Sequence, residues 1–468
     1  MQKIYNTLTR KTEVLEPREK GKIKLFVCGP TVYDSPHIGH ARTYIAFDMI
    51  AKYLKTKGYD VFYLQNITDI DDKIIKRAAE KGITPKELAL KFEKEYMDAM
   101  EDLKVNSVSK YARATDHIKE IIGQVKKLLE KGYAYQISDG IYYDVSKSID
   151  YGKLSGRTAL QAEDSVSRID ESIEKRNKGD FCLWKFSKEG EPSWSFDSQN
   201  SLRIKAGRPG WHIEDTAITE KYLGQQYDIH GGARDLIFPH HEAEIAQMEA
   251  ISGKKPLVNC WLHTGFLAVN GQKMSKSLGN FIAVDEFLSE NSARILRLLV
   301  LKNHYRSPID YSEKEIGEEK SQLARIDEFT DKLKNIKKDG KKSGNDFIEQ
   351  FRKDFETAME DDLNTPEALA VIFGLINKAN ILLNGKSLDY NAARNILKFL
   401  EEIDGFFGFI FGNDKKEKIP AKVRELADER EKYRREKNWQ KADEIRGATG
   451  QAGYMIEDTE NGPKIKKI

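Results

Sequence analysis

The chain has 468 residues, of which 39% are hydrophobic and 32% are charged, so it carries enough apolar material for sizeable cores and wholesale disorder is excluded. Its 77 Lys and Arg residues nearly balance its 75 Asp and Glu residues, and the formal net charge of +2 excludes a uniformly cationic coat. No apolar run approaches the ~20 residues that a membrane-spanning helix needs, the first ten residues are mainly polar, and the three cysteines are scattered. We therefore expect a soluble, multi-domain protein of the cytoplasm with no membrane partner.

The chain opens with the pattern of a parallel α/β sheet. Residues 22–29 form an apolar strand that ends at Gly-Pro, residues 39–57 are helical, and residues 60–65 form a second strand. This order predicts a right-handed crossover between parallel strands. Ligands bind such sheets at the carboxyl ends of the strands, which is where Cys28 lies.

The rest of the chain changes character several times. Residues 84–131 have a helical pattern, and residues 132–206 are rich in aromatic residues, Gly and Ser, which favours a β-rich insertion. Residues 211–265 return to short strands and a helix, and from Asp285 onward we expect an almost wholly helical chain. The predicted divisions are a sheet domain (1–131 and 207–265), the insertion (132–206), a loop region (266–320), a helical bundle (321–412) and a small C-terminal tail (413–468).

The first motif with chemical meaning is His37-Ile-Gly-His40, where the first strand leads into the first helix. A helix N-terminus offers unpaired N–H groups and a partial positive charge, which suit phosphate. Two imidazoles ahead of it can donate to phosphate oxygens as charge builds, and Gly39 leaves room for a flat base against the backbone. Taken alone, the motif is equally well interpreted as a histidine-containing turn.

The second motif is Lys273-Met274-Ser275-Lys276-Ser277, in a loop flanked by Gly and Asn. Two lysines on a mobile loop can neutralise a departing pyrophosphate and release it when the loop opens. An isolated motif of this kind is more often a solvated basic turn. The two motifs in this order, far apart and both on loops, are a much stronger indication together.

This pair resembles the signatures of class I aminoacyl-tRNA synthetases. Further segments narrow the resemblance to the cysteinyl-tRNA synthetase family, over nearly the whole chain: Cys28–Asp34, Asn66–Asp69, Gly210–Glu214 and His230–Glu242. The resemblance implies a Rossmann-like catalytic domain with a connective insertion, a helical bundle that binds the anticodon stem, and an anticodon-binding tail. It also implies that ATP activates L-cysteine to cysteinyl-adenylate, which is transferred to the 3′-terminal ribose of tRNA(Cys) with release of AMP and pyrophosphate.

The resemblance also implies roles for individual residues. The implied catalytic residues are His37, His40, Lys273 and Lys276; the implied ATP-binding residues are Gly39, Gly232, Asp235, Lys273, Met274, Ser275 and Lys276; the implied substrate-binding residues are Cys28, Thr68 and Trp211. Mg²⁺ is expected with ATP. From the residues alone, Asp235 is a turn residue and Trp211 is equally well a core residue.

The resemblance further implies one zinc ion that grips the substrate thiolate. His240 and Glu244 share one helical face at a spacing that allows a common metal, and Cys28 ends a strand at the same edge of the sheet. Where the family has a second ligand cysteine, this chain has Asp215. The ligand set Cys28, Asp215, His240 and Glu244 keeps the formal charge but is harder, so its preference for soft metals should weaken. The alternative is that Asp215 points elsewhere and the metal is lost or held by three ligands.

The remaining cysteines and histidines carry no predicted chemistry. Cys182 and Cys260 lie among apolar and aromatic residues, as buried structural thiols do. His241 and His263 match no ligand spacing.

RNA recognition is expected in the C-terminal third. Residues 415–446 hold 12 basic and 8 acidic residues, and Tyr433 and Trp439 lie among them, where they can stack on unpaired anticodon bases. A solvated amphipathic helix explains the same pattern. We expect a monomer, although the sequence does not decide the oligomeric state.

Three other functions stay open at this point. The chain can be a ligase that joins activated cysteine to a small amine such as an amino sugar, a non-catalytic RNA-binding paralogue, or a synthetase with altered amino-acid specificity. The segment Trp439–Arg446 favours tRNA as the acceptor, and the intact histidine and lysine motifs argue against a non-catalytic paralogue. Asp215 keeps altered specificity open.

Overall fold

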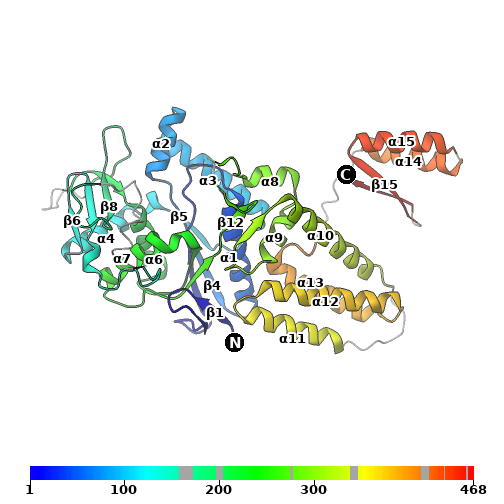
Figure 1. Cartoon of the computed structure of the whole chain (residues 1–468), viewed down its shortest axis with the longest axis horizontal. Coiled ribbons are helices and arrows are strands. Elements are labelled where there is room, and N and C mark those ends of the chain that lie inside the picture. The colour runs from blue at the N-terminus through cyan, green and yellow to red at the C-terminus, as the bar shows by residue number, and fades with distance from the viewer. Residues whose placement is uncertain are drawn as a thin grey trace. The chain divides into compact units, whose positions relative to one another are not determined.

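The computed structural model describes residues 1–157, 172–196, 204–274, 278–337, 346–412, 421–436, 438–459 and 462–467. The chain divides into two compact units, residues 1–411 and residues 412–468. Figure 1 shows the elements of both units, coloured in chain order from the N-terminus to the C-terminus.

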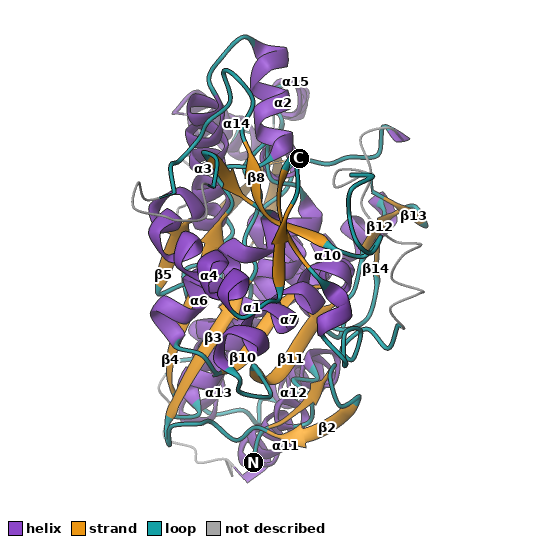
Figure 2. Cartoon of the chain, turned by 90° about the vertical axis from the view of Figure 1, so that its left-hand side faces the viewer, coloured by secondary structure: helices purple, strands orange, loops and turns teal. Residues whose placement is uncertain are grey.

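A five-stranded parallel sheet forms the centre of the first unit. Its strand order is β11 (Val258–Thr264), β10 (Tyr227–Ala233), β3 (Lys22–Val27), β4 (Asp60–Ile67) and β5 (Lys110–Arg113). The strands lie side by side in Figure 2. The chain order of the strands reverses between β10 and β3, and sheets of this kind bind ligands at such a reversal. The predicted Rossmann-like α/β fold is confirmed.

Alternation along β3 determines which helix each side chain meets. Leu25 and Val27 pack in one core with α1 (Ile38–Thr56), the predicted crossover helix. Phe26 and Cys28 belong to the other core, together with residues of α6 (Trp211–Leu223) and α7 (Glu242–Ser252). Because side chains alternate across a strand, Cys28 faces the side of the sheet that α6 and α7 cover.

The helical prediction for residues 84–131 is wrong in part. The segment contains α3 (Pro85–Asp102) and α4 (Ile118–Glu130), but β5 and a short turn (Ala114–His117) lie between them. β5 is a four-residue edge strand, too short for its alternation to stand out against two helical patterns. α2 (Asp72–Lys81) precedes α3 and begins at the N-cap Asp71.

The inserted segment forms a four-stranded antiparallel sheet of β6 (Ala134–Gln136), β7 (Gly140–Tyr143), β8 (Phe181–Phe186) and β9 (Gly207–Pro209). β9 lies just beyond residue 206, where the sequence placed the end of the insertion. The next residue, Gly210, is the N-cap of α6, and a Cβ atom there would lie 1.9 Å from the Cys182 carbonyl oxygen. The insertion therefore leads directly into the helix that carries Trp211 and Asp215.

The expectation of an almost wholly helical chain beyond Asp285 is wrong at two places. β14 (Ile309–Tyr311) pairs in parallel with β12 (Leu267–Val269), which in turn pairs with β13 (Gln272–Lys273). The second unit ends in a hairpin of β15 (Tyr454–Thr459) and β16 (Gly462–Lys467). A hairpin of β1 (Lys3–Asn6) and β2 (Lys11–Val14) opens the chain.

Helices dominate the later part of the first unit. They are α8 (Val284–Glu290), α9 (Ala293–Leu301), α10 (Glu313–Lys334), α11 (Asp346–Glu360), α12 (Thr365–Asn384) and α13 (Tyr390–Phe407). By length and composition alone α12 could cross a membrane, which the sequence prediction missed. Its buried residues pack in the helical core with residues of α11 and α13, as those of a bundle helix do.

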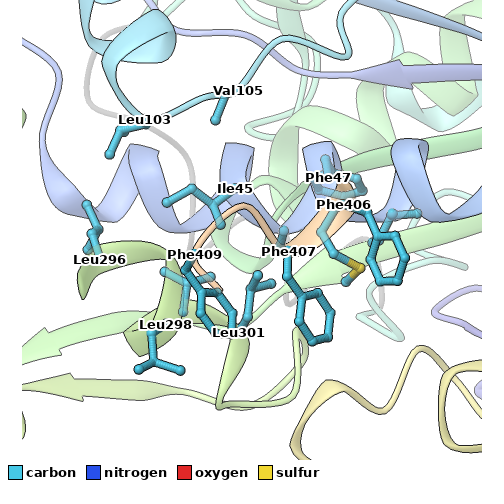
Figure 3. Packing of buried hydrophobic residues seen from close by; sticks show 14 of the residues in the cluster. Ile45, Phe47, Leu103, Val105, Leu296, Leu298, Leu301, Phe406, Phe407 and Phe409 are labelled. Atoms are coloured by element: carbon cyan, nitrogen blue, oxygen red, sulfur yellow. The ribbon is translucent and has the colours of Figure 1, made fainter. Parts of the chain in front are cut away.

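A buried charge joins this helical region to the sheet. Arg297 of α9 is fully buried, and its guanidinium donates to Asp48 Oδ2 of α1 at 3.1 Å and to the carbonyl oxygens of Phe406, Phe407 and Leu103. Ile45, Phe47, Leu296 and Phe409 are members of one hydrophobic core in this part of the molecule (Figure 3). Arg297 therefore links α9 to α1, to α13 and to the end of α3.

The second unit contains α14 (Ala421–Arg435) and α15 (Trp439–Gln451) ahead of its hairpin. Val423, Ala427, Ala442 and Ile456 are buried within the unit. Trp439 is 59% exposed at the first position of α15, and Lys441 Nζ lies 5.0 Å from the centroid of the Tyr433 ring.

Replacing Arg297 should destabilise the first unit. In Arg297→Leu the carbonyls at the end of α13 lose their donor and buried Asp48 loses its ion pair with α9, so we expect the apparent free energy of unfolding to fall by about 3–5 kcal/mol. Urea denaturation followed by circular dichroism measures it. As a control, Lys332→Ala removes an exposed pair with Glu328 and should change little. Equal effects of the two variants would contradict the argument.

Candidate active site

A cavity of about 350 Å³ opens at the carboxyl edge of the sheet, beside the junction of β3 and β10. Residues from distant parts of the sequence line it. Those that the sequence singled out are Cys28, His37, Gly39, His40, Trp211, Asp235 and Met274. The reversal of strand order explains why these segments meet, since the loops that follow β3 and β10 part there.

The loop after β3 is held closely against the loop after β4. The Gly29 N–H donates to Asn66 Oδ1 at 2.6 Å, and the backbones of Val32 and Thr68 pair through a hydrogen bond of 3.1 Å. A Cβ atom on Gly29 would lie 1.7 Å from the Asn66 carbonyl oxygen, so only glycine permits this approach. This contact fixes the position of Cys28, which directly follows β3.

His37 and His40 form a reciprocal cap at the start of α1. His37 Nδ1 accepts from the His40 N–H at 3.3 Å, and His40 Nδ1 accepts from the His37 N–H at 3.4 Å, while the two rings stack at 3.7 Å. This cap engages both Nδ1 atoms, and both residues line the cavity. Burial, and the neighbouring His37, lower the pKa of His40 well below its usual value, so its ring is neutral.

Only some of the nucleotide-binding residues implied by the resemblance line the cavity. Asp235 and Met274 line the cavity, and a Cβ atom on Gly39 would lie 3.1 Å from Met274 Cε. Gly232 lies deeper, where a Cβ atom would lie 2.9 Å from the His241 ring. The side chain of Lys273, and Ser275 and Lys276, lie outside the described residues.

The four predicted metal ligands converge beside the cavity. Candidate ligand atoms of Cys28, Asp215, His240 and Glu244 all lie within 4.8 Å of one another, and all four residues are buried. His240 Nε2 lies 3.0 Å from Asp215 Oδ2 and 3.3 Å from Glu244 Oε1, and Glu244 Oε1 lies 3.9 Å from Cys28 Sγ. Asp215 therefore points into this group.

The donor set fits a divalent cation. Asp215 Oδ1 and Glu244 Oε2 are buried acceptors without a hydrogen-bond partner among the described residues. Burial raises the pKa of Glu244, and the neighbouring Asp215 and Glu214 raise it further. Burial also raises the pKa of the Cys28 thiol, with further contributions from Glu244 and Asp215. A bound cation would relieve this accumulation of negative charge.

The two other predicted substrate-binding residues are arranged differently. Trp211 is 39% exposed, lines the cavity and stacks on His240 with ring centroids 4.2 Å apart. Thr68 is buried and donates to Glu214 Oε1, next to the metal group rather than in the cavity wall. Burial and Asp215 raise the pKa of Glu214.

Histidines that the sequence could not place surround Cys28. His230 Nε2 lies 3.4 Å and His241 Nε2 lies 3.1 Å from Cys28 Sγ, and these atoms with Glu244 form a second group of potential ligands. His263 contacts His241 at 2.8 Å. The prediction that His241 matches no ligand group is wrong, whereas His263 belongs to neither group and only contacts His241. His230 pairs with Phe26 across the sheet, so its proximity to Cys28 follows only once β10 is known to adjoin β3.

Comparisons with known proteins agree with this geometry. A family model described as tRNA synthetases class I (C) catalytic domain matches residues 14–321, and one described as DALR domain matches residues 354–412. The chain is 46% identical to the cysteine–tRNA ligase of Thermococcus gammatolerans, over 100% of this chain and 99% of that one. It is 43% identical to the cysteine–tRNA ligase of Carboxydothermus hydrogenoformans, over 100% of both chains.

Solved structures show the same fold. The methionyl-tRNA synthetase of Mycobacterium tuberculosis in complex with methionyl-adenylate superposes with a TM-score of 0.60 at 16% identity, over 83% of this chain and 90% of that chain. The leucyl-tRNA synthetase (LeuRS) in a ternary complex from Agrobacterium radiobacter K84 has a TM-score of 0.60 at 12% identity, over 85% of each chain.

Substituting Gly29 should disturb the site through its backbone. Gly29→Ala forces a methyl group onto the Asn66 carbonyl, so we expect the thermal midpoint to fall and metal affinity to drop with it. Gly123→Ala is the matched control, because Gly123 lies inside α4 with open space around its Cβ position and should gain about 0.5–1 kcal/mol. Differential scanning fluorimetry with and without Zn²⁺ compares them. A Gly29→Ala variant as stable as Gly123→Ala would refute the close approach.

Proposed function

The chain belongs to the cysteine–tRNA ligase family of class I aminoacyl-tRNA synthetases, and we propose that it recognises the thiol of its substrate through a zinc ion held by Cys28, Asp215, His240 and Glu244. As a member of this family it is a ligase that activates cysteine with ATP and attaches it to tRNA. The observation that supports the proposed metal site is the convergence of ligand atoms from four buried residues. Both carboxylates in this set have one oxygen without a hydrogen-bond partner among the described residues.

Thiol recognition is a demanding task because serine differs from cysteine by one atom. A pocket that discriminates by size alone rejects such analogues only ~10–200-fold. A bound zinc ion supplies a Lewis acid that prefers thiolate to hydroxyl. Trp211 fits the role of a wall for the substrate, since it lies between the cavity and His240.

The protein's own groups fit an adenylation step. The substrate carboxylate attacks the α-phosphate of ATP, and no protein nucleophile is needed because positioning and electrostatics carry phosphoryl transfer. His37 and His40 line the cavity at the N-terminus of α1, where imidazoles can contact the phosphates. Asp235 is proposed to accept from ribose hydroxyls, and Gly39 to admit the base. Mg²⁺ accompanies ATP, and Lys273 and Lys276 are proposed to stabilise the leaving pyrophosphate.

Pyrophosphate exchange tests the proposed selectivity. With a zinc-loaded protein we expect cysteine to be preferred over serine by more than the ~200-fold that size allows. Removing the metal with a chelator should abolish cysteine activation, and adding Zn²⁺ should restore it. Serine activation near the cysteine rate, or full activity in metal-depleted protein, would refute metal-based recognition.

Asp215 is expected to be a true ligand that makes the metal site harder. Asp215→Asn removes its charge, so Zn²⁺ affinity should fall by at least the ~10–100-fold that loss of a supporting contact costs. Asp215→Cys should keep Zn²⁺ binding and raise the ratio of Cd²⁺ to Mn²⁺ affinity, because a thiolate is softer than a carboxylate. Competition titrations with a chromophoric chelator measure all three proteins. An unchanged metal preference in Asp215→Cys would mean that residue 215 does not ligate the metal.

We further propose that the helical bundle and the second unit bind tRNA(Cys), with the second unit contacting the anticodon. Trp439 offers an exposed indole at the start of α15, and Tyr433 and Lys441 lie together nearby in the same unit. Exposed aromatic rings among basic residues are suited to unpaired bases. Cytoplasmic location and a monomeric state are part of the same proposal.

Trp439→Ala should weaken tRNA binding by about 1–3 kcal/mol if the indole stacks on a base. Filter binding with tRNA(Cys) transcripts at fixed ionic strength measures the change. Leu90→Ala truncates another exposed apolar side chain, on α3, and should leave the affinity unaltered. If both variants bind tRNA as the wild type does, the second unit does not use Trp439 to hold RNA.

A further inference from the structure

The imidazoles around Cys28 form two hydrogen-bonded chains that both end at its sulfur. In the first, Tyr227 OH lies 2.7 Å from His230 Nδ1, and His230 Nε2 lies 3.4 Å from Cys28 Sγ. In the second, His263 Nδ1 lies 2.8 Å from Thr7 Oγ1, its Nε2 lies 2.8 Å from His241 Nδ1, and His241 Nε2 lies 3.1 Å from Cys28 Sγ. Each chain therefore begins at a hydroxyl and ends at the same thiol.

One arrangement of protons satisfies every contact in both chains. A thiolate and a carboxylate can only accept, so the Nε2 atoms of His230 and His241 must donate toward Cys28 when it is a metal ligand. Each ring then accepts at Nδ1. Tyr227 OH then donates a hydrogen bond to His230 Nδ1. His263 accepts from Thr7 Oγ1 at Nδ1 and donates from Nε2 to His241 Nδ1.

Packing holds both rings in these orientations. His230 stacks on Trp261 with centroids 4.2 Å apart and is fully buried. His241 is also fully buried, and the absence of a side chain at Gly232 leaves space for its ring, because a Cβ there would lie 2.9 Å away. Side chains packed this closely keep one rotamer, so the donors stay directed at the sulfur.

Charge explains why such donors are needed. Ionised Cys28, Asp215 and Glu244 carry three negative charges, so a divalent cation leaves one uncompensated in a buried group. Neutral N–H donors stabilise that remaining charge without adding a cation. Cys28 is also the only sulfur in the ligand set, so these donors act on the one soft ligand that the protein contributes.

From this arrangement we infer that His230 and His241 are positioning residues that donate N–H···S hydrogen bonds to the Cys28 thiolate and thereby weaken its donation to the metal. This inference rests on the proposed metal site and adds a role for residues outside it. A less basic protein thiolate leaves the metal a stronger acceptor for the thiolate of the substrate. The two histidines thus favour substrate binding through Cys28 rather than by touching the substrate.

Cobalt substitution tests the inference in the full-length protein, because thiolate-to-Co²⁺ charge-transfer absorption reports directly on the sulfur. His230→Phe and His241→Phe remove the donors, so the band should move to longer wavelength and the apparent KM for cysteine should rise. His230→Gln and His241→Gln place an amide N–H near the same point and should restore the band. His117→Phe is the matched control, since buried His117 contacts the Arg113 carbonyl and Tyr222 OH instead of a proposed metal ligand, and the band should stay in place.

Each other outcome would overturn the inference. A band that does not move in the Phe variants means that the histidines do not act on the sulfur. Two Co²⁺ ions bound per protein molecule would mean that His230 and His241 ligate a second cation with Cys28 and Glu244. A protein that binds no metal contradicts both the proposed metal site and this inference. A protein that binds Co²⁺ but whose band does not move in the Phe variants contradicts this inference alone.

A measurement on the unaltered protein covers the case in which the Phe variants fail to fold. Nitrogen NMR of the histidine-labelled, zinc-loaded chain reads the tautomer of each ring, with His→Gln variants for assignment. We expect protons on the Nε2 atoms of His230 and His241. A proton on Nδ1 of either ring would overturn the inference.

Discussion

The burial of three acidic groups within a few ångströms is the constraint on which the site depends. Cys28, Asp215 and Glu244 come from a strand end and two helices, and in an apolar interior their negative charges repel one another. Desolvation raises the pKa of Cys28 and of Glu244, which favours their protonated forms. A fold that brings them together without a cation bears a cost that a bound metal removes, so metal binding and local stability are coupled.

The surrounding architecture serves to maintain that convergence. Gly29 lets the loop after β3 approach Asn66, which sets the position of Cys28. Gly210 lets the end of the insertion approach Cys182, which sets the start of α6 and hence Asp215. Glycines thus permit close backbone approaches on both sides of the ligand set, while Arg297 ties the same framework to the helical region through α1.

Much of this arrangement follows from sequence, and its limits have physical causes. The apolar pattern of residues 22–29, which ends at Gly-Pro, predicts a strand, and the histidine motif predicts a helix start, because both depend on local sequence. β5 and β14 escaped prediction because three- or four-residue strands are stabilised by their neighbours rather than by their own pattern. The contact between His241 and His263 was not predicted, because it depends on the pairing of β10 with β11, and the spacing of residues along the sequence does not show which strands pair.

The proposed ligand set has Asp215 where the resemblance implies a second ligand cysteine. A carboxylate carries the same charge as a thiolate, so the proposed set keeps the same electrostatic balance with a cation. The proposed set is harder, since it contains one sulfur instead of two. Any influence on that single sulfur therefore weighs more, and the imidazoles of His230 and His241 lie within hydrogen-bonding distance of it. In the proposed site, preference for a thiol substrate therefore depends on the sulfur that the substrate brings, because the proposed ligand set leaves most of the soft coordination to it.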